Sequence, residues 1–139
     1  MERKTALITG ATSGIGEACA RRFANGGYNI IITGRTADKL QALKAELETE
    51  GVSVLALAFD VCDRNATREA VNSIPDSFKP IDVLINNAGL ARGLEPEYEG
   101  SFQDWDEMID TNIKGLLNMT RLVVPQMVSL NHGHVINIG

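Results

Sequence analysis

The sequence predicts an α/β fold in which a doubly wound parallel sheet carries helices on both faces. Two observations lead to this class. Short apolar runs alternate with longer segments whose apolar residues recur at helical spacing, so strands and helices follow one another along the chain. The short runs are rich in β-branched residues and nearly continuous in hydrophobicity, which is typical of strands covered on both faces. Parallel strands of this kind are joined by right-handed crossovers.

The predicted elements come in strict alternation. The strands are Ala6–Thr9, Tyr28–Thr33, Val52–Phe59, Ile81–Ile85 and His134–Ile138. The helices between them are Ile15–Asn25, a helix from Thr36 to about Glu50, a helix from Asp63 to Ile74, and Phe102 to about Leu130. Glycine or proline follows each of the first three helices directly, as expected of segments that stop there.

Capping residues support the helix starts. Thr36 and Asp63 stand where an N-cap oxygen is expected, and Ser101 has Asp104 three residues on, in capping-box position. Pro125 is expected to kink the last helix, because it removes a backbone donor and crowds a carbonyl one turn earlier. The apolar stripe of that helix predicts a core face: Trp105, Met108, Ile109, Ile113, Leu116, Leu117, Val123, Val124 and Met127.

Composition limits the classes of function. A chain of 139 residues that is 44% hydrophobic and 22% charged suits a single globular domain. Its net charge is −5 with no block of like charges, which excludes a nucleic-acid surface or a basic membrane patch. No apolar run is long enough for a membrane span, and no leader is visible. Cys19 and Cys62 lack paired spacing and are expected to be reduced thiols of a cytoplasmic protein. His132 and His134 do not make a metal site.

A glycine cluster marks the turn from the first strand to the first helix. Its residues are Gly10, Ala11, Thr12, Ser13, Gly14, Ile15 and Gly16. Gly10 can adopt backbone angles that other residues avoid, Gly14 leaves room for a ligand near the backbone, and Gly16 lets the helix pack closely on the sheet. Free amide groups at the helix start then suit a pyrophosphate. The alternative is a plain strand-to-helix turn.

Arg35 follows the second strand, where a residue that reads the adenosine ribose is expected. An acidic side chain here would accept hydrogen bonds from the 2′-hydroxyl of NAD, whereas an arginine suits the 2′-phosphate of NADP. The sequence therefore favours NADP over NAD. The alternative is a solvated arginine near a helix start.

These motifs occur together and in order: TGATSGIG, GR after the second strand, Asp60-Val61 after the third, NNAG from Asn86 to Gly89 after the fourth, and DTNIKG with Asn112. In this combination the chain resembles the short-chain dehydrogenase/reductase family over nearly its whole length, and thereby a Rossmann-type fold. The run from Gly89 to Thr120 looks like the NADP-dependent 3-hydroxy acid (serine-type) dehydrogenase subgroup.

The resemblance implies roles for individual residues. Gly10 to Gly16 would hold the pyrophosphate and the adjoining ribose, and Arg35 with Thr36 the 2′-phosphate. Asp60 would bind the adenine amino group, with Val61 beside the ring. The ribose would be lined by Asn87, Ala88 and Gly89, while Asn86 would brace the central strands.

Asn112 lies on the apolar stripe of the last helix, which predicts a buried amide that needs a partner. An internal hydrogen bond to backbone would satisfy it. The resemblance adds a catalytic role through a water in a proton relay. Gly115, one turn later, indicates that another backbone or a ligand comes close to the helix there.

The resemblance also implies a catalytic serine and a Tyr-x-x-x-Lys motif after the last strand, but the sequence stops at Gly139. Neither Tyr28 nor Tyr98 can replace that tyrosine. We therefore expect residues 1–139 to be the cofactor-binding domain of a longer protein, with the sheet incomplete at its C-terminal side and the strand His134–Ile138 at an open edge.

Two functions follow. The parent protein would be an oxidoreductase that transfers a hydride between NADP and a small alcohol or carbonyl substrate, such as a 3-hydroxy acid, and would form a homo-oligomer. The rival is a nucleotide-binding module without catalysis, if the chain truly ends at Gly139.

Overall fold

A computed structural model of the protein describes residues 3–12, 14–89 and 99–139. A five-stranded sheet has the order β3-β2-β1-β4-β5, and all four pairings are parallel. The strands are β1 (Thr5–Ile8), β2 (Asn29–Gly34), β3 (Val54–Ala58), β4 (Val83–Asn86) and β5 (His134–Asn137). The predicted class and the five predicted strands are confirmed, and β5 forms an edge of the sheet.

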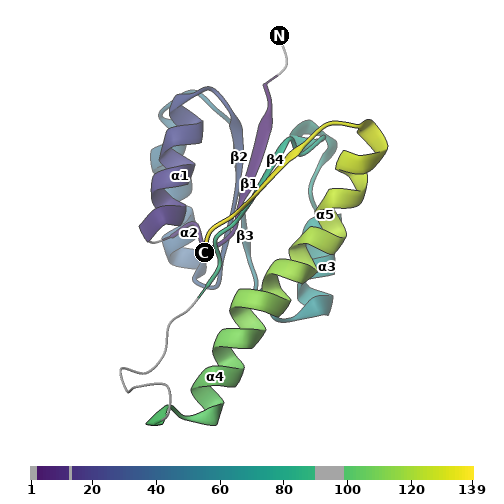
Figure 1. Cartoon of the computed structure of the whole chain (residues 1–139). Helices are drawn as coiled ribbons and strands as arrows, with labels where there is room; N and C mark the ends of the chain where they lie inside the picture. The colour runs from purple at the N-terminus through teal and green to yellow at the C-terminus, as the bar shows by residue number, and fades with distance from the viewer. Residues whose placement is uncertain (1–2, 13, 90–98) are drawn as a thin grey trace.

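Helices cover both faces (Figure 1). They are α1 (Gly14–Asn25), α2 (Ala37–Glu48), α3 (Arg64–Asn72), α4 (Phe102–Ile109) and α5 (Leu116–Leu130), with a short 3₁₀ helix η1 (Asp76–Phe78) and a π-helical turn η3 (Asp110–Gly115). In Figure 1, α1 and α2 lie on one side of the sheet, and α3 and α5 lie on the other. This is the doubly wound arrangement that the sequence predicts.

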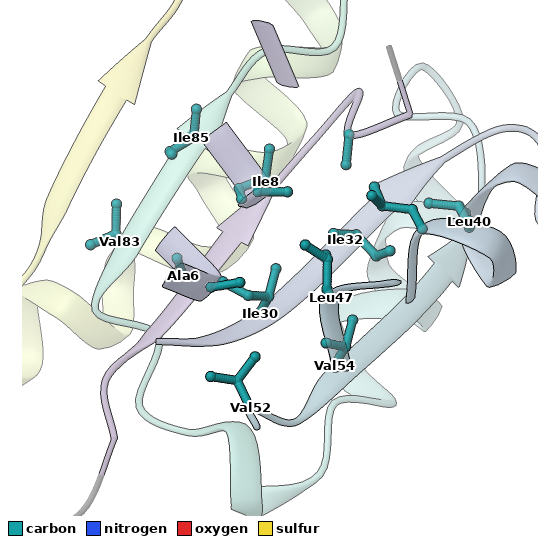
Figure 2. Close-up of a cluster of buried hydrophobic side chains, with 14 residues drawn as sticks. Ala6, Ile8, Ile30, Ile32, Leu40, Leu47, Val52, Val54, Val83 and Ile85 are labelled. Atoms are coloured by element: carbon teal, nitrogen blue, oxygen red, sulfur yellow. The ribbon is translucent and has the colours of Figure 1, made fainter. Parts of the chain in front are cut away.

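Alternation along the strands produces two cores. Ile30 and Ile32 of β2 belong to the cluster under α1 and α2, which Figure 2 shows in close-up. Ile31, between them, belongs to the cluster under α5. All three side chains are fully buried, because successive residues of a strand point to opposite faces and both faces are covered. Burial of each such side chain stabilises the fold by about 1.5–3 kcal/mol.

The helix caps follow the predictions with one exception. The Asp63 carboxylate accepts from the Ala66 amide at 3.0 Å, and the Ser101 hydroxyl accepts from the Asp104 amide at 3.0 Å. Thr36 occupies the N-cap position of α2 with extended backbone angles, but its hydroxyl makes no capping bond. The prediction that the Thr36 hydroxyl caps α2 was therefore wrong. Thr36 instead lines a pocket at the carboxyl ends of the strands.

The predicted long helix is interrupted by η3, an expanded turn between α4 and α5. Turns of this kind are rare and concentrate at functional sites. Pro125 lies inside α5, which continues through it. The close approach predicted at Gly115 is confirmed, but among the described residues the neighbour is a side chain and not the predicted backbone: a Cβ on Gly115 would lie 2.5 Å from Val61 Cγ2.

Only the C-terminal half of the apolar stripe is core. Val123 and Met127 are buried, whereas Ile109, Ile113 and Leu117 are 47%, 54% and 57% exposed. In Figure 1, α4 extends beyond the ends of the strands, so this part of the helical segment has no sheet to pack against. The prediction that the whole stripe is core was wrong. For the same reason Asn112 is exposed, so the predicted buried amide was also wrong.

Candidate cofactor-binding site

The candidate site lies at the carboxyl ends of β1 to β4, where parallel α/β sheets bind ligands. Two pockets open there and share Ala88 and Gly89. The first, of about 240 Å³, is termed the β2–β3 pocket and is lined by Gly10, Thr12, Thr33, Gly34, Arg35, Thr36, Lys39, Phe59, Asp60, Val61, Ala88, Gly89 and Thr111. The second, of about 650 Å³, is termed the β4–β5 pocket and is lined by Ile15, Asn86, Asn87, Ala88, Gly89, Asn112, Leu116, Asn137, Ile138 and Gly139.

The glycine-rich turn connects β1 to α1 in a shape that needs its glycines. Gly10 and Gly14 have φ values of +60° and +56°, in the left-handed region that side chains disfavour. A Cβ on Gly16 would overlap the Gly10 carbonyl oxygen and the Asn87 side-chain amide. No described atom lies within 4 Å of where a Gly14 Cβ would be, so the turn is open at that point. The predicted conformation of Gly10 and the close packing at Gly16 are confirmed.

The rest of the turn is held to the neighbouring strands. The Ala11 amide donates to the Thr33 carbonyl at 3.0 Å, and Ala11 itself is fully buried. Thr12 lines the β2–β3 pocket and Ile15 lines the β4–β5 pocket, so the turn borders both. Ser13, also predicted here, lies outside the described residues.

Thr9 is a residue of the site that the sequence did not reveal. Its buried hydroxyl oxygen accepts from the Asn87 amide at 2.9 Å and from the Ala88 amide at 2.8 Å. The Asn87 side chain in turn donates to the Gly10 carbonyl at 3.0 Å. These bonds fix the loop after β4 against the glycine-rich turn. A threonine at the end of a buried strand was the available signal, because its hydroxyl needs a partner there.

Arg35 and Thr36 leave β2 and reach the β2–β3 pocket, as predicted from their sequence position. Lys39, in the first turn of α2, lines the same pocket and was not predicted. Asp60, which also lines this pocket, accepts from the Cys62 amide at 2.9 Å, and this bond fixes the turn after β3. The pocket therefore combines two cations with one carboxylate among its lining residues.

The lining of the β4–β5 pocket includes hydrogen-bonded asparagine side chains. The Asn86 side chain donates to Asn137 Oδ1 at 3.0 Å and to Thr120 Oγ1 at 3.3 Å. Asn86 thereby braces β4, β5 and α5, as predicted for this residue. Its own Oδ1 is buried without a hydrogen-bond partner among the described residues. Asn112, from η3, lines this pocket too, although it is exposed.

A family model described as short chain dehydrogenase matches residues 4–139. The chain belongs to the short-chain dehydrogenase family. Its glycine-rich turn, Asp60-Val61, the NNAG loop and Asn112 are brought to one edge of the sheet, as the family resemblance implied.

Relatives and solved structures in the family agree with this assignment. The NADP-dependent 3-hydroxy acid dehydrogenase of Salmonella typhi is 55% identical over 133 residues, which is 96% of this chain and 52% of that protein. The serine 3-dehydrogenase of Agrobacterium fabrum is 48% identical over 134 residues, again 96% of this chain and 52% of the relative. A closed form of serine dehydrogenase complexed with NADP+ matches with a TM-score of 0.91 at 50% identity, covering 97% of this chain and 53% of that one. The chain thus spans about half the length of these family members.

Cys62 follows the pocket residues Asp60 and Val61 in the sequence, but it is unsuited to nucleophilic chemistry. Burial raises the pKa of its thiol above the usual value, and its sulfur lies 3.3 Å from the Thr111 hydroxyl. Because a cysteine with a raised pKa stays protonated at neutral pH, this sulfur is a poor nucleophile.

Proposed function

We propose that the chain binds NADP and forms the cofactor-binding domain, residues 1–139, of an oxidoreductase acting on an alcohol or carbonyl substrate. The observation that carries the proposal is the glycine-rich turn at the start of α1, which opens beside a pocket lined by Arg35. The turn presents amide groups to an anion, and the arginine offers a charge for an extra phosphate. The relatives named for NADP dependence support this choice of cofactor.

The residues present fit such a dinucleotide. Gly10, Gly14 and Gly16 would let the pyrophosphate approach the backbone at the start of α1, with Ala11, Thr12 and Ile15 completing the turn. Thr33 Oγ1 is buried and has no hydrogen-bond partner among the described residues, and Thr33 lines the pocket where the adenosine would lie. When bound, NADP would supply or accept the hydride.

The remaining pocket residues would orient the two ends of the cofactor. Arg35 and Thr36 would bind the 2′-phosphate, while Asp60 and Val61 would border the adenine. The ribose would lie along Asn87, Ala88 and Gly89. In the β4–β5 pocket, Asn112 would hold a water close to the reacting atoms. This assignment places the hydride-transfer end of the cofactor at the larger pocket.

Replacing Arg35 with aspartate is expected to reverse the cofactor preference. The new carboxylate would repel the 2′-phosphate and accept hydrogen bonds from the 2′-hydroxyl of NAD, so NADP+ binding should weaken roughly a hundredfold relative to NAD+. Calorimetric titration of both nucleotides into the wild type and Arg35→Asp measures the change. An unchanged preference for NADP+ in the variant would show that Arg35 does not read the phosphate.

For the substrate, we propose a small 3-hydroxy acid. This substrate class is supported by two relatives that are 55% and 48% identical, which are named a 3-hydroxy acid dehydrogenase and a serine 3-dehydrogenase. The decisive experiment supplies the parent protein with NADP+ and a panel of 3-hydroxy acids and simple alcohols, and records NADPH absorbance. Turnover with 3-hydroxy acids above the simple alcohols is expected. NADP+ binding without turnover of any compound would instead indicate a non-catalytic nucleotide-binding module.

We further propose that the parent protein is a cytoplasmic homo-oligomer. Both cysteines are free, as expected for a reducing compartment. Among the described helices, none has the length and apolar character to span a membrane. An exposed apolar row recurs at intervals of four residues and consists of Ile109, Ile113 and Leu117. A second subunit would cover this row.

Replacing Ile113 with glutamate is expected to dissociate the oligomer, because a carboxylate in a desolvated interface is strongly unfavourable. Sedimentation velocity would show a smaller species for Ile113→Glu than for the wild type. Val128→Glu serves as a control, since Val128 is 74% exposed but lies outside the row. An unchanged sedimentation coefficient for Ile113→Glu would refute this interface.

A further inference from the structure

Lys39 lines the β2–β3 pocket and is positively charged, but the proposed binding of NADP gives it no role so far. It lies three residues after Thr36, so the two side chains start from the same face of the first turn of α2. Both line the pocket together with Arg35. Within the described chain, neither Lys39 nor Arg35 has an ion-pair partner. Two exposed cations therefore line one small cavity without an ion pair, and Asp60 is the single carboxylate among the lining residues.

The start of α2 adds to the positive potential. This helix has 12 residues, and its N-cap threonine makes no side-chain capping bond. The first amide groups of the helix thus retain their capacity to donate, and the helix dipole places partial positive charge there. A lysine in the first turn is mildly unfavourable on its own for the same reason. An anion bound between Lys39 and Arg35 would offset both effects.

A buried hydroxyl supplies a second, independent indication of a ligand. Thr33 is 1% exposed, lines the same pocket, and its Oγ1 has no hydrogen-bond partner among the described residues. Buried polar atoms are nearly always hydrogen-bonded in folded proteins, and an exception calls for a missing partner. A polar ligand in the β2–β3 pocket would provide that partner.

We propose that Lys39 is a second side chain that recognises the 2′-phosphate, acting with Arg35 and the uncapped start of α2. The inference rests on the proposed binding of NADP and specifies how the site selects it. The phosphate is a dianion with three acceptor oxygens, and one guanidinium cannot satisfy all of them. Lys39 contributes a point charge on a flexible stem from the helix side, while Arg35 contributes a planar fork from the end of β2. Lys39 is thus a specificity-determining residue.

Calorimetric titrations of the parent protein with NADP+ and with NAD+ test the proposal. The proteins compared are the wild type, Lys39→Gln, Lys39→Arg, Arg35→Gln and Lys44→Gln. Lys44 is the matched control, because it lies on α2 but does not line the pocket. We expect Lys39→Gln to weaken NADP+ binding about five- to tenfold and to leave NAD+ binding unchanged. Lys39→Arg should retain most of the affinity for NADP+, and Lys44→Gln should bind both nucleotides as the wild type does.

The outcomes separate this inference from the proposed function. If the wild type prefers NADP+, Arg35→Gln loses that preference and Lys39→Gln behaves like Lys44→Gln, the role of Lys39 is overturned while NADP binding stands. A wild type without affinity for NADP+ overturns both. Equal weakening of NADP+ and NAD+ by Lys39→Gln would also overturn the inference, since it would indicate a general effect on the pocket. Thermal unfolding of each variant confirms that it is folded during the titrations.

Discussion

Gly16→Ala should lose both stability and cofactor binding. A methyl group on residue 16 would overlap the Gly10 carbonyl oxygen and the Asn87 side-chain amide, and the carbonyl belongs to the backbone and cannot rotate away. Relief requires α1 to move off the turn, which we expect to cost about 3 kcal/mol of unfolding free energy, at the upper end of overpacking effects. The same movement displaces the amide groups proposed to hold the pyrophosphate, so NADP+ affinity should fall at least roughly tenfold.

Denaturant unfolding and calorimetric titration measure the two effects, and Gly14→Ala provides the comparison. Gly14 also has a positive φ, but its Cβ would meet no described atom within 4 Å. Gly14→Ala should therefore cost only the backbone strain of about 1–2 kcal/mol. If Gly16→Ala is no less stable than Gly14→Ala, the close packing of α1 on the turn does not limit residue 16.

Thr9→Val is expected to be the most damaging change of a single side chain in the site. Valine has nearly the same shape, but it removes the oxygen that accepts from the Asn87 and Ala88 amides. Each buried donor left without an acceptor costs about 1–3 kcal/mol, so the variant should lose roughly 2–4 kcal/mol of unfolding free energy. The loop after β4 would also lose its attachment to the glycine-rich turn.

Thr9→Ser is the matched control for this prediction, because it keeps the hydroxyl and removes only a methyl group. Denaturant unfolding of the cofactor-free protein should rank the wild type first, Thr9→Ser close below it and Thr9→Val well below both. Equal stability of the serine and valine variants would show that the two amides find other partners, and that the hydroxyl of Thr9 does not hold the loop.

The sequence was sufficient for the sheet and the glycine-rich turn because both are encoded locally. Ile30 to Ile32 form an uninterrupted apolar run, and such a run specifies a strand covered on both faces wherever it occurs in the fold. Gly10 and Gly16 were interpretable because a strand precedes them and a helix follows. The capping residues Asp63 and Ser101 act within three residues of their own positions. The described residues among the predicted site residues that adjoin these elements accordingly lie together at the carboxyl ends of the strands.

The features that the sequence did not predict depend on contacts between residues far apart in the chain. The hydroxyl of Thr9 bonds to amides 78 and 79 residues away, and no local pattern records that pairing. Lys39 resembles any charged residue of an exposed helix until the fold brings it into the same pocket as Asp60 and Val61, which follow β3. The exposure of Asn112 and Ile113 follows from α4 extending past the sheet. Helical periodicity identifies an apolar face, but it does not say whether the same chain covers that face.

The strand order has a consequence for how this fold tolerates change. The chain builds outward from β1 to β3, then returns across β1 to place β4 on its other side. Helix α1, which follows β1, and helix α5, which lies between β4 and β5 in the chain, therefore lie on opposite faces of the sheet, and the two pockets open at this topological switch point. Exposed lining residues such as Arg35 and Lys39 belong to neither buried cluster, so they can be exchanged without loss of core packing.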